Sequence, residues 1–87
     1  MVVWTAYLRH RAQVRGFDLE TIEQIVQFAE ERYFDTVTQR RVVVGRHGDR
    51  LVVIPYEQEG ESFTPITVHA TTRQQIAFRL RTGRFQP

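Results

Sequence analysis

One short stretch of the sequence, residues 63–85, contains side chains suited to acid–base and phosphate chemistry. His69 can take up or release a proton near neutral pH, because a free imidazole has a pKa of about 6.5. Arg73 stands at the expected start of a helix, where unpaired backbone N–H groups favour a bound anion. Thr71 lies between them and offers a hydroxyl group that can hydrogen-bond phosphate. These residues predict a site that acts on a phosphate ester.

Acid–base catalysis at a phosphate needs a group that transfers a proton and a cation that stabilises the charge on the phosphate. We assign His69 as the base or the acid and Arg73 as the cation. Arg41 joins them if its strand presents it on the same face as His69. An ordinary surface histidine with solvated arginines is the alternative.

Other arginines are candidates for contacts with the phosphates of a polyanion. Arg11 and Arg15 lie near the edge of the apolar stripe of an expected helix, and Arg46 flanks an expected turn. Cations of this kind bind phosphates without distinguishing one base from another. A hydrated helix face is the alternative for this cluster.

The charges of the chain are unevenly distributed. The formal net charge is +2, and all twelve basic residues are arginines. Residues 1–15, 36–56 and 73–84 are basic, whereas residues 16–35 and 57–61 are acidic. The basic segments would form a surface for a polyanion if they converge in space. Arginine suits phosphate because its fork binds two oxygens at once, although a GC-rich genome or a hot habitat would also favour it.

The composition also excludes several classes of site. The absence of cysteine rules out disulfides and thiolate metal ligands. His10, His47 and His69 do not have the spacing of metal ligands, so we expect no metal or other cofactor. No apolar run approaches the roughly 20 residues of a membrane span. The first residues lack the pattern of a signal peptide, which makes a cytoplasmic protein the expectation.

The sequence predicts one domain over residues 1–87, beginning with two helices. Apolar residues at helical spacing predict the first helix over residues 5–15, and Gly16 ends it. Asp18 is a good N-cap for the second, which we expect to run to Arg32. Its apolar stripe comprises Leu19, Ile22, Ile25, Val26 and Ala29, and this pattern is the most regular in the chain.

Antiparallel strands and a last helix complete the expected α+β fold. Residues 40–46 and 51–57 predict a hairpin with a turn at Gly48, after a connection over residues 33–39. Residues 66–70 alternate, so Ile66, Val68 and Ala70 should share one face and His69 the other. Thr72 should cap the last helix, with Gln75 reaching back to it. We expect Ile76, Ala77 and Leu80 inside, an end at Gly83, and three to four strands in the sheet.

Four short motifs of the sequence can be compared with known families: residues 15–20, 41–45, 50–53 and 66–75. In these motifs and in the order of its elements, the chain resembles the small RelE/barnase-like ribonucleases. It is most similar to BrnT-type toxins and related uncharacterised bacterial domains of that superfamily. The resemblance covers roughly residues 10–82. It differs where the family often has a basic residue at the position of His69, and glutamate at the position of Gln75.

The resemblance implies the toxin of a type II toxin–antitoxin pair, which cleaves RNA without a metal ion. Its partners would be RNA and an antitoxin protein, for example of the ribbon-helix-helix type. On this hypothesis His69, Arg73 and Arg41 are catalytic, and the residues that bind RNA are Arg11, Arg15, Arg46 and Thr71. The alternative is a non-catalytic protein-interaction or nucleic-acid-binding module with the same fold, which the lack of lysine and the single candidate histidine favour.

Overall fold

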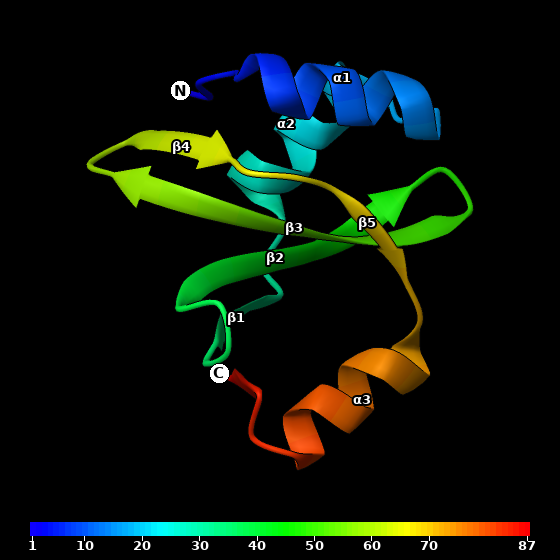
Figure 1. Cartoon of the computed structure of the whole chain (residues 1–87), viewed down its shortest axis with the longest axis vertical. Helices are drawn as coiled ribbons and strands as arrows, with labels where there is room; N and C mark the ends of the chain where they lie inside the picture. Colours follow the sequence, from blue (N-terminus) through cyan, green and yellow to red (C-terminus); the bar gives the residue numbers. More distant parts are fainter.

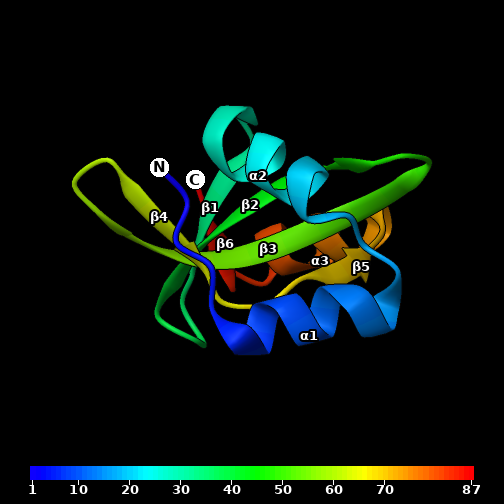
Figure 2. The ribbon, with the colours of Figure 1, turned by 90° about the horizontal axis from the view of Figure 1, so that it is seen from above.

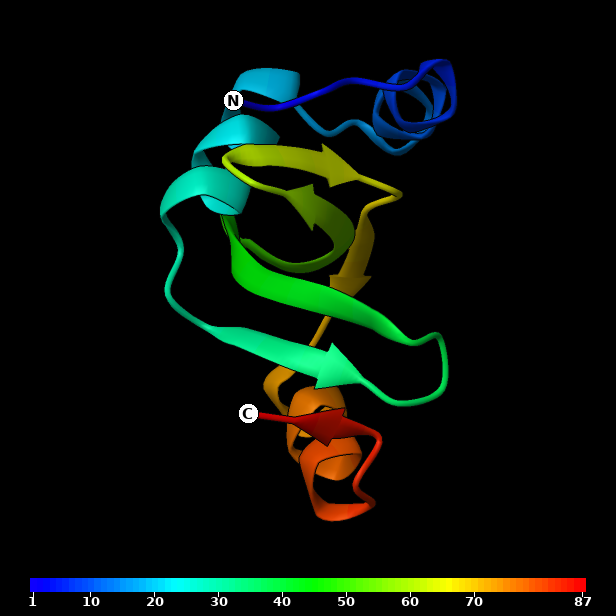
Figure 3. The ribbon, with the colours of Figure 1, turned by 90° about the vertical axis from the view of Figure 1, so that its left-hand side faces the viewer.

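The computed structural model describes residues 1–87 and has an α+β architecture. Helices α1 (Ala6–Arg15) and α2 (Leu19–Phe28) come first, and helix α3 (Arg73–Arg81) lies near the C-terminus. The sheet lies between them, with α1 and α2 on one side and α3 on the other (Figures 1 and 3). Seen from above, α1 lies beside the β5 edge of the sheet and α2 over β2 (Figure 2). The predicted fold class is confirmed.

The sheet is antiparallel and has six strands, rather than the three or four expected. Five of them follow the order β4-β3-β2-β1-β6, and β5 pairs with β3 beyond the end of β4. The three strands that the sequence did not predict are short, four residues each in β1 and β4 and two in β6, and such short segments leave no periodic pattern. The strand bounds are β1 (Arg32–Asp35), β2 (Arg40–His47), β3 (Arg50–Glu59), β4 (Ser62–Pro65), β5 (His69–Thr71) and β6 (Phe85–Gln86).

Two apolar clusters fill the two faces of the sheet. The larger one joins α1 and α2 to Val43, Val52, Ile54 and Tyr56 of the sheet. The smaller one lies on the α3 side and contains Val42, Val44, Leu51, Val53, Ile76 and Phe85. Alternate residues of β2 and β3 therefore belong to different clusters, as expected for strands that are buried on both faces.

Local hydrogen bonds set the ends of the first two helices. The side chain of Thr5 accepts the N–H of Leu8 at the start of α1, and Gly16 ends that helix with a φ of 73°. The carboxylate of Asp18 accepts the N–H of Thr21, as the sequence predicts. The helix α2 ends at Phe28, four residues earlier than expected.

Arg32 explains the early end of α2. Its guanidinium group donates to the carbonyl groups of Val26 and Ala29. Carbonyl groups at the end of a helix would otherwise lack hydrogen-bond partners. The same group lies over the rings of Tyr56 and Phe63. Arg32 therefore turns back onto the helix end and begins β1 instead of continuing the helix.

A β-bulge separates β4 from β5. Pro65 lies opposite Tyr56 of β3, and His69 lies opposite Val53. The chain therefore advances four residues from Pro65 to His69 while β3 advances three, which leaves one extra residue between β4 and β5. The extra residue reverses the faces of the later side chains relative to Pro65, and of the strand predicted over residues 66–70 only the part from His69 onward forms. Val68 and Ala70 share the predicted face, since Val68 belongs to the larger cluster and Ala70 lies opposite Val52 of the same cluster, but Ala70 is exposed.

The last helix differs from its prediction in two respects, the hydrogen bond of Gln75 and the exposure of Ala77. Thr72 caps it by accepting the N–H of Gln75, as expected, and Gly83 ends it with a φ of 80°. The side chain of Gln75 does not reach back to Thr72 but accepts a hydrogen bond from Thr71. Ile76 is the buried residue of α3, and Ala77 is exposed because α3 covers only one narrow part of the sheet.

Candidate phosphate-binding cleft

A cleft of about 350 Å³ lies between α3 and the sheet. Its floor is apolar and includes Val42, Val53 and Phe85. The polar side chains around it come from the strands β1 and β5, from α3, from the loop between β1 and β2 and from the loop before β6, and they are Asp35, Thr38, His69, Thr71, Gln75, Arg79 and Arg84. The C-terminal segment thus supplies most of the positive charge of this cleft.

His69 faces the cleft because of the β-bulge. It is opposite Val53, which is itself opposite Val44, and both valines belong to the cluster on the α3 side. Bulges often re-aim side chains in this way beside functional sites. The sequence correctly identified His69 as a residue outside the main apolar face.

Arg15 holds the ring of His69 from α1. Its Nη1 donates to the carbonyl oxygen of Val68 at 3.0 Å and lies 2.9 Å from Nδ1 of His69. Because a guanidinium group can only donate, Nδ1 must be the unprotonated nitrogen, and Nε2 carries the proton of the neutral ring. Arg50 fixes this end of α1, since it donates to the carbonyl group of Gly16 and lies 4.1 Å from the Phe17 ring centroid.

The surroundings of His69 favour its neutral form. Burial lowers its pKa below the usual 6.5, and the nearby charges of Arg15, Arg11 and Arg79 lower the pKa further. His69 is therefore uncharged at pH 7, with one lone pair at Nδ1. No carboxylate opposes these three arginines at the imidazole.

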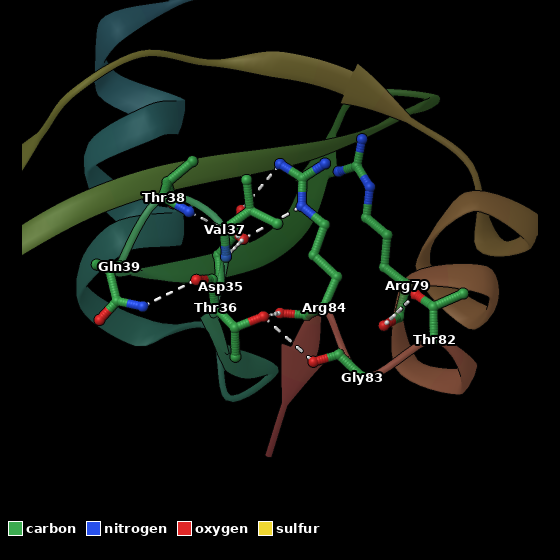
Figure 4. Close-up of polar contacts among 9 residues, drawn as sticks. All are labelled: Asp35, Thr36, Val37, Thr38, Gln39, Arg79, Thr82, Gly83 and Arg84. Carbon is green, nitrogen blue, oxygen red and sulfur yellow. Dashed lines mark hydrogen bonds and ion pairs between the residues drawn. The ribbon is translucent and has the colours of Figure 1, made fainter.

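Arg79 is the cation of the cleft that has no partner. It makes no ion pair and its side chain donates no hydrogen bond within the chain, although it lies over the ring of Phe85, with 5.4 Å between the guanidinium carbon and the ring centroid. Arg79 extends beside Arg84 in the same direction (Figure 4). Two guanidinium groups thus lie at one site, which favours a bound anion.

Arg84 is held in place by Asp35. Its Nε and Nη2 donate to the two carboxylate oxygens, each at 3.1 Å, in the bidentate arrangement typical of arginine (Figure 4). Asp35 is 3% exposed. Burial alone would raise its pKa, but hydrogen bonds from Arg84 and from the N–H groups of Val37 and Thr38 outweigh burial and lower the pKa. Nη1 of Arg84 has no partner in the chain.

Thr71 and Gln75 form the rim beside His69. The hydroxyl of Thr71 donates to Oε1 of Gln75 at 3.0 Å, so the amide nitrogen of Gln75 remains a free donor. The cleft therefore offers N–H groups from Arg79, Arg84, His69 and Gln75, while its one carboxylate, that of Asp35, is already paired. This donor set suits a phosphate group.

The three residues predicted to be catalytic do not come together. Arg73 donates from Nη1 to both carboxylate oxygens of Glu31, at 2.8 and 2.7 Å, which neutralises it outside the cleft. Arg41 lies opposite Tyr56, on the α1 and α2 face, whereas His69 is on the α3 face. Of the three, only His69 lines the cleft, because the strand register decides the position of Arg41 and Glu31, in the connection between α2 and β1, decides that of Arg73.

The other predicted RNA contacts are divided between the cleft and its surroundings. Thr71 lines the cleft, and Arg15 touches His69. Arg11 is close enough to lower the pKa of His69, and its buried Nε has no hydrogen-bond partner. Arg46 is exposed near the end of β2, in the same cross-strand row as Leu51 and Thr71.

Sequence reasoning missed the two arginines that define the cleft, Arg79 and Arg84, and the buried Asp35. One signal was available: Gln75 and Arg79 are four residues apart and so share one face of a helix. The pairing of Arg84 with Asp35 joins positions 49 residues apart and leaves no local pattern.

Comparisons with known proteins found no match to this chain among family models, curated proteins or solved structures. None of its helices has the length and apolar character required to cross a lipid bilayer. No three histidine or carboxylate side chains lie together in an arrangement that would hold a metal ion.

Proposed function

We propose that this domain binds single-stranded RNA in the cleft under α3 and cleaves it without a metal ion. The observation that carries the proposal is the convergence of a neutral histidine, His69, with the unpaired cation Arg79 at one donor-rich cleft. Cleavage of RNA needs these two functions together, a base and a cation for the developing phosphate charge. Arg79 and Arg84 replace Arg73 and Arg41 in the roles first expected for them.

In the proposed reaction His69 takes the proton of the 2′-hydroxyl group. The 2′-oxygen then attacks the phosphorus, the bond to the 5′-oxygen breaks, and the products are a 2′,3′-cyclic phosphate and a 5′-hydroxyl end. Arg79 and Arg84 stabilise the charge on the phosphate oxygens. The cleft contains no second group that can donate a proton at pH 7, so water protonates the leaving oxygen and we expect slow turnover.

Arg15 must move before His69 can act as a base. The lone pair of the neutral ring is at Nδ1, where Arg15 now donates. An incoming phosphate competes for the same guanidinium group, since a charged acceptor binds arginine more strongly than a neutral ring. On this proposal RNA binding releases Nδ1, so the base becomes available only when substrate is present.

The resemblance to BrnT-type toxins extends the proposal to a biological role. A nuclease without sequence selectivity would harm its own cell, so we propose that the domain is the toxin of a toxin–antitoxin pair and is blocked by an antitoxin protein. Growth arrest on expression of the wild-type chain, relieved by His69→Ala, is the result this role predicts. Normal growth with a cleavage-competent protein would contradict it.

A second candidate function is RNA binding without cleavage. One observation favours it: with Arg15 on Nδ1, the nitrogen that remains for a ligand is Nε2, which is a donor and not a base. In that case His69 contributes a hydrogen bond to the phosphate. The same cleft would then belong to a nucleic-acid-binding module.

The test is incubation of the protein with a single-stranded RNA oligonucleotide in excess chelator, followed by analysis of the product ends. We expect cyclic phosphate ends with the wild type and with Arg81→Ala, a matched control because Arg81 is exposed on α3 outside the cleft. His69→Ala and Arg79→Ala should lose cleavage while keeping a wild-type circular dichroism spectrum. Undiminished cleavage by both variants would overturn the assignment, and binding without cleavage by the wild type would support the second function.

A further inference from the structure

A second groove, of about 590 Å³, lies on the other face of the sheet from the cleft. Phe34, Arg41 and Tyr56 form one cross-strand row along its base, in β1, β2 and β3. Phe34 is half-buried, whereas Tyr56 is only 2% exposed and belongs to the core. Phe34 is therefore the aromatic side chain of this groove that retains accessible surface.

The charge of the groove is positive on one side and acidic on the other. Arg41 is exposed and has no ion-pair partner. Arg40 is 3.9 Å from Glu57, a surface pair that neutralises little in water. Glu57 and Glu59 continue along the β3–β4 hairpin, so an anionic ligand would be attracted to the Arg41 side and repelled from the hairpin.

The groove and the cleft meet at one residue. Thr38, in the turn between β1 and β2, lines both of them. This turn and the β3–β4 hairpin lie on the same side of the molecule (Figure 1). A chain molecule that leaves the cleft across Thr38 would enter the groove directly.

We propose that the groove binds the nucleotide that follows the dinucleotide step held in the cleft, with its base stacked on Phe34 and its phosphate at Arg41. The inference rests on the proposed function and adds a second nucleotide site for its single-stranded RNA substrate. Aromatic side chains stack on unpaired bases whatever their identity, and an adjacent arginine holds the backbone. A duplex is too stiff to pass around the end of the sheet from the cleft into the groove. The acidic β3–β4 hairpin repels further phosphates, so only a short segment of RNA contacts the groove.

The test compares the affinities of two ligands by fluorescence anisotropy: a 2′-O-methyl dinucleotide, which reaches the cleft alone, and a 2′-O-methyl octanucleotide, which can reach both sites. Neither can be cleaved. We expect Arg41→Ala and Phe34→Leu to weaken octanucleotide binding roughly 10-fold, the effect typical of one lost stacking or phosphate contact. Both variants should bind the dinucleotide as the wild type does, and Arg81→Ala should leave both affinities unchanged.

Four outcomes would overturn the inference or separate it from the proposed function. Equal octanucleotide affinities for the wild type and Phe34→Leu, with matching thermal unfolding curves, would exclude the stack. Loss of dinucleotide binding in Arg41→Ala would mean that this arginine acts at the cleft instead. If Arg79→Ala binds the dinucleotide normally, the cleft proposal fails, whereas a length-dependent effect of Phe34→Leu would still support the groove. A duplex octamer that binds as tightly as the single strand would contradict the substrate class.

Discussion

Arg15 and His69 are 54 positions apart in the chain, yet Nη1 of the arginine lies 2.9 Å from Nδ1 of the histidine. This contact joins the end of α1 to the edge strand β5. It fixes the tautomer of the imidazole and places a positive charge beside it. It therefore joins the predicted RNA-binding arginine directly to the predicted catalytic histidine, a contact that neither prediction included.

The first prediction concerns the pKa of His69. Replacing Arg15 by alanine removes a nearby positive charge and opens the ring to solvent, and both effects raise the pKa toward 6.5. An NMR titration of the imidazole signals in the wild type and in Arg15→Ala measures the change. Arg9→Ala, on the exposed side of α1, is the control, and an unchanged or lower pKa in Arg15→Ala would contradict the contact.

The second prediction is that acid destabilises the fold through His69. Its folded pKa is below the unfolded value of about 6.5, so the unfolded chain binds the proton more readily in this range. The stability contributed by the neutral ring is complete above pH 6.5 and falls as the pH drops from there toward the folded pKa. Urea unfolding at a series of pH values from 7.5 to 5 should show this slope in the wild type. His69→Gln should flatten it.

The third prediction concerns the buried pair of Asp35 and Arg84. Arg84→Gln leaves an ionised carboxylate buried without its cation, and we expect a loss near the lower end of the range of about 3–5 kcal/mol in the free energy of unfolding at pH 7. The folded pKa of Asp35 is lowered, so this stabilisation is complete above pH 3.8 and lost as the pH falls through the folded value.

Urea unfolding between pH 7 and pH 2.5 tests the pair. Arg84→Gln should show a weaker dependence on pH below 4 than the wild type, because the favourable interaction with the carboxylate has gone. Arg81→Ala, which removes an exposed arginine of α3, should unfold as the wild type does at every pH. Equal stability of Arg84→Gln and the wild type at pH 7 would contradict the structural role of the pair.

The fourth prediction concerns the salt dependence of RNA binding. Each phosphate contact with single-stranded nucleic acid contributes about 0.7 to the slope of log affinity against log salt concentration. Arg79→Ala should lower the slope by about that amount and weaken binding at low salt, whereas Arg81→Ala should change neither. Anisotropy measurements with an uncleavable oligonucleotide at several salt concentrations give both quantities. A slope that Arg79→Ala leaves unaltered would place the RNA elsewhere.

The fifth prediction concerns the contact between α2 and β2 at Gly45. A Cβ atom there would lie 2.6 Å from Cγ2 of Ile25, so Gly45→Ala should destabilise the fold by about 1–3 kcal/mol. The clash should largely disappear in a chain that already has Ile25→Ala. Thermal or urea unfolding of the two single variants and the double variant measures this coupling. Strictly additive effects would mean that the two residues do not touch.

The sequence by itself determined the elements whose causes are local. Thr5, Asp18 and Thr72 cap the helices that begin next to them, and Gly16 and Gly83 end two of them, because each such hydrogen bond or backbone conformation involves only a few neighbouring residues. The long hairpin also followed from its two apolar runs and the turn at Gly48 between them. These elements were sufficient to predict the α+β class.

The tertiary structure alone decided which charged side chains share a site. Arg73 pairs with Glu31 and Arg84 with Asp35, across 42 and 49 residues, and no periodicity records such pairs. The β-bulge between β4 and β5 decided that His69 faces α3, since one extra residue reverses the faces of a strand. The sequence therefore identified the histidine, but packing between distant elements chose Arg79 and Arg84, rather than Arg73 and Arg41, as its neighbours in the cleft.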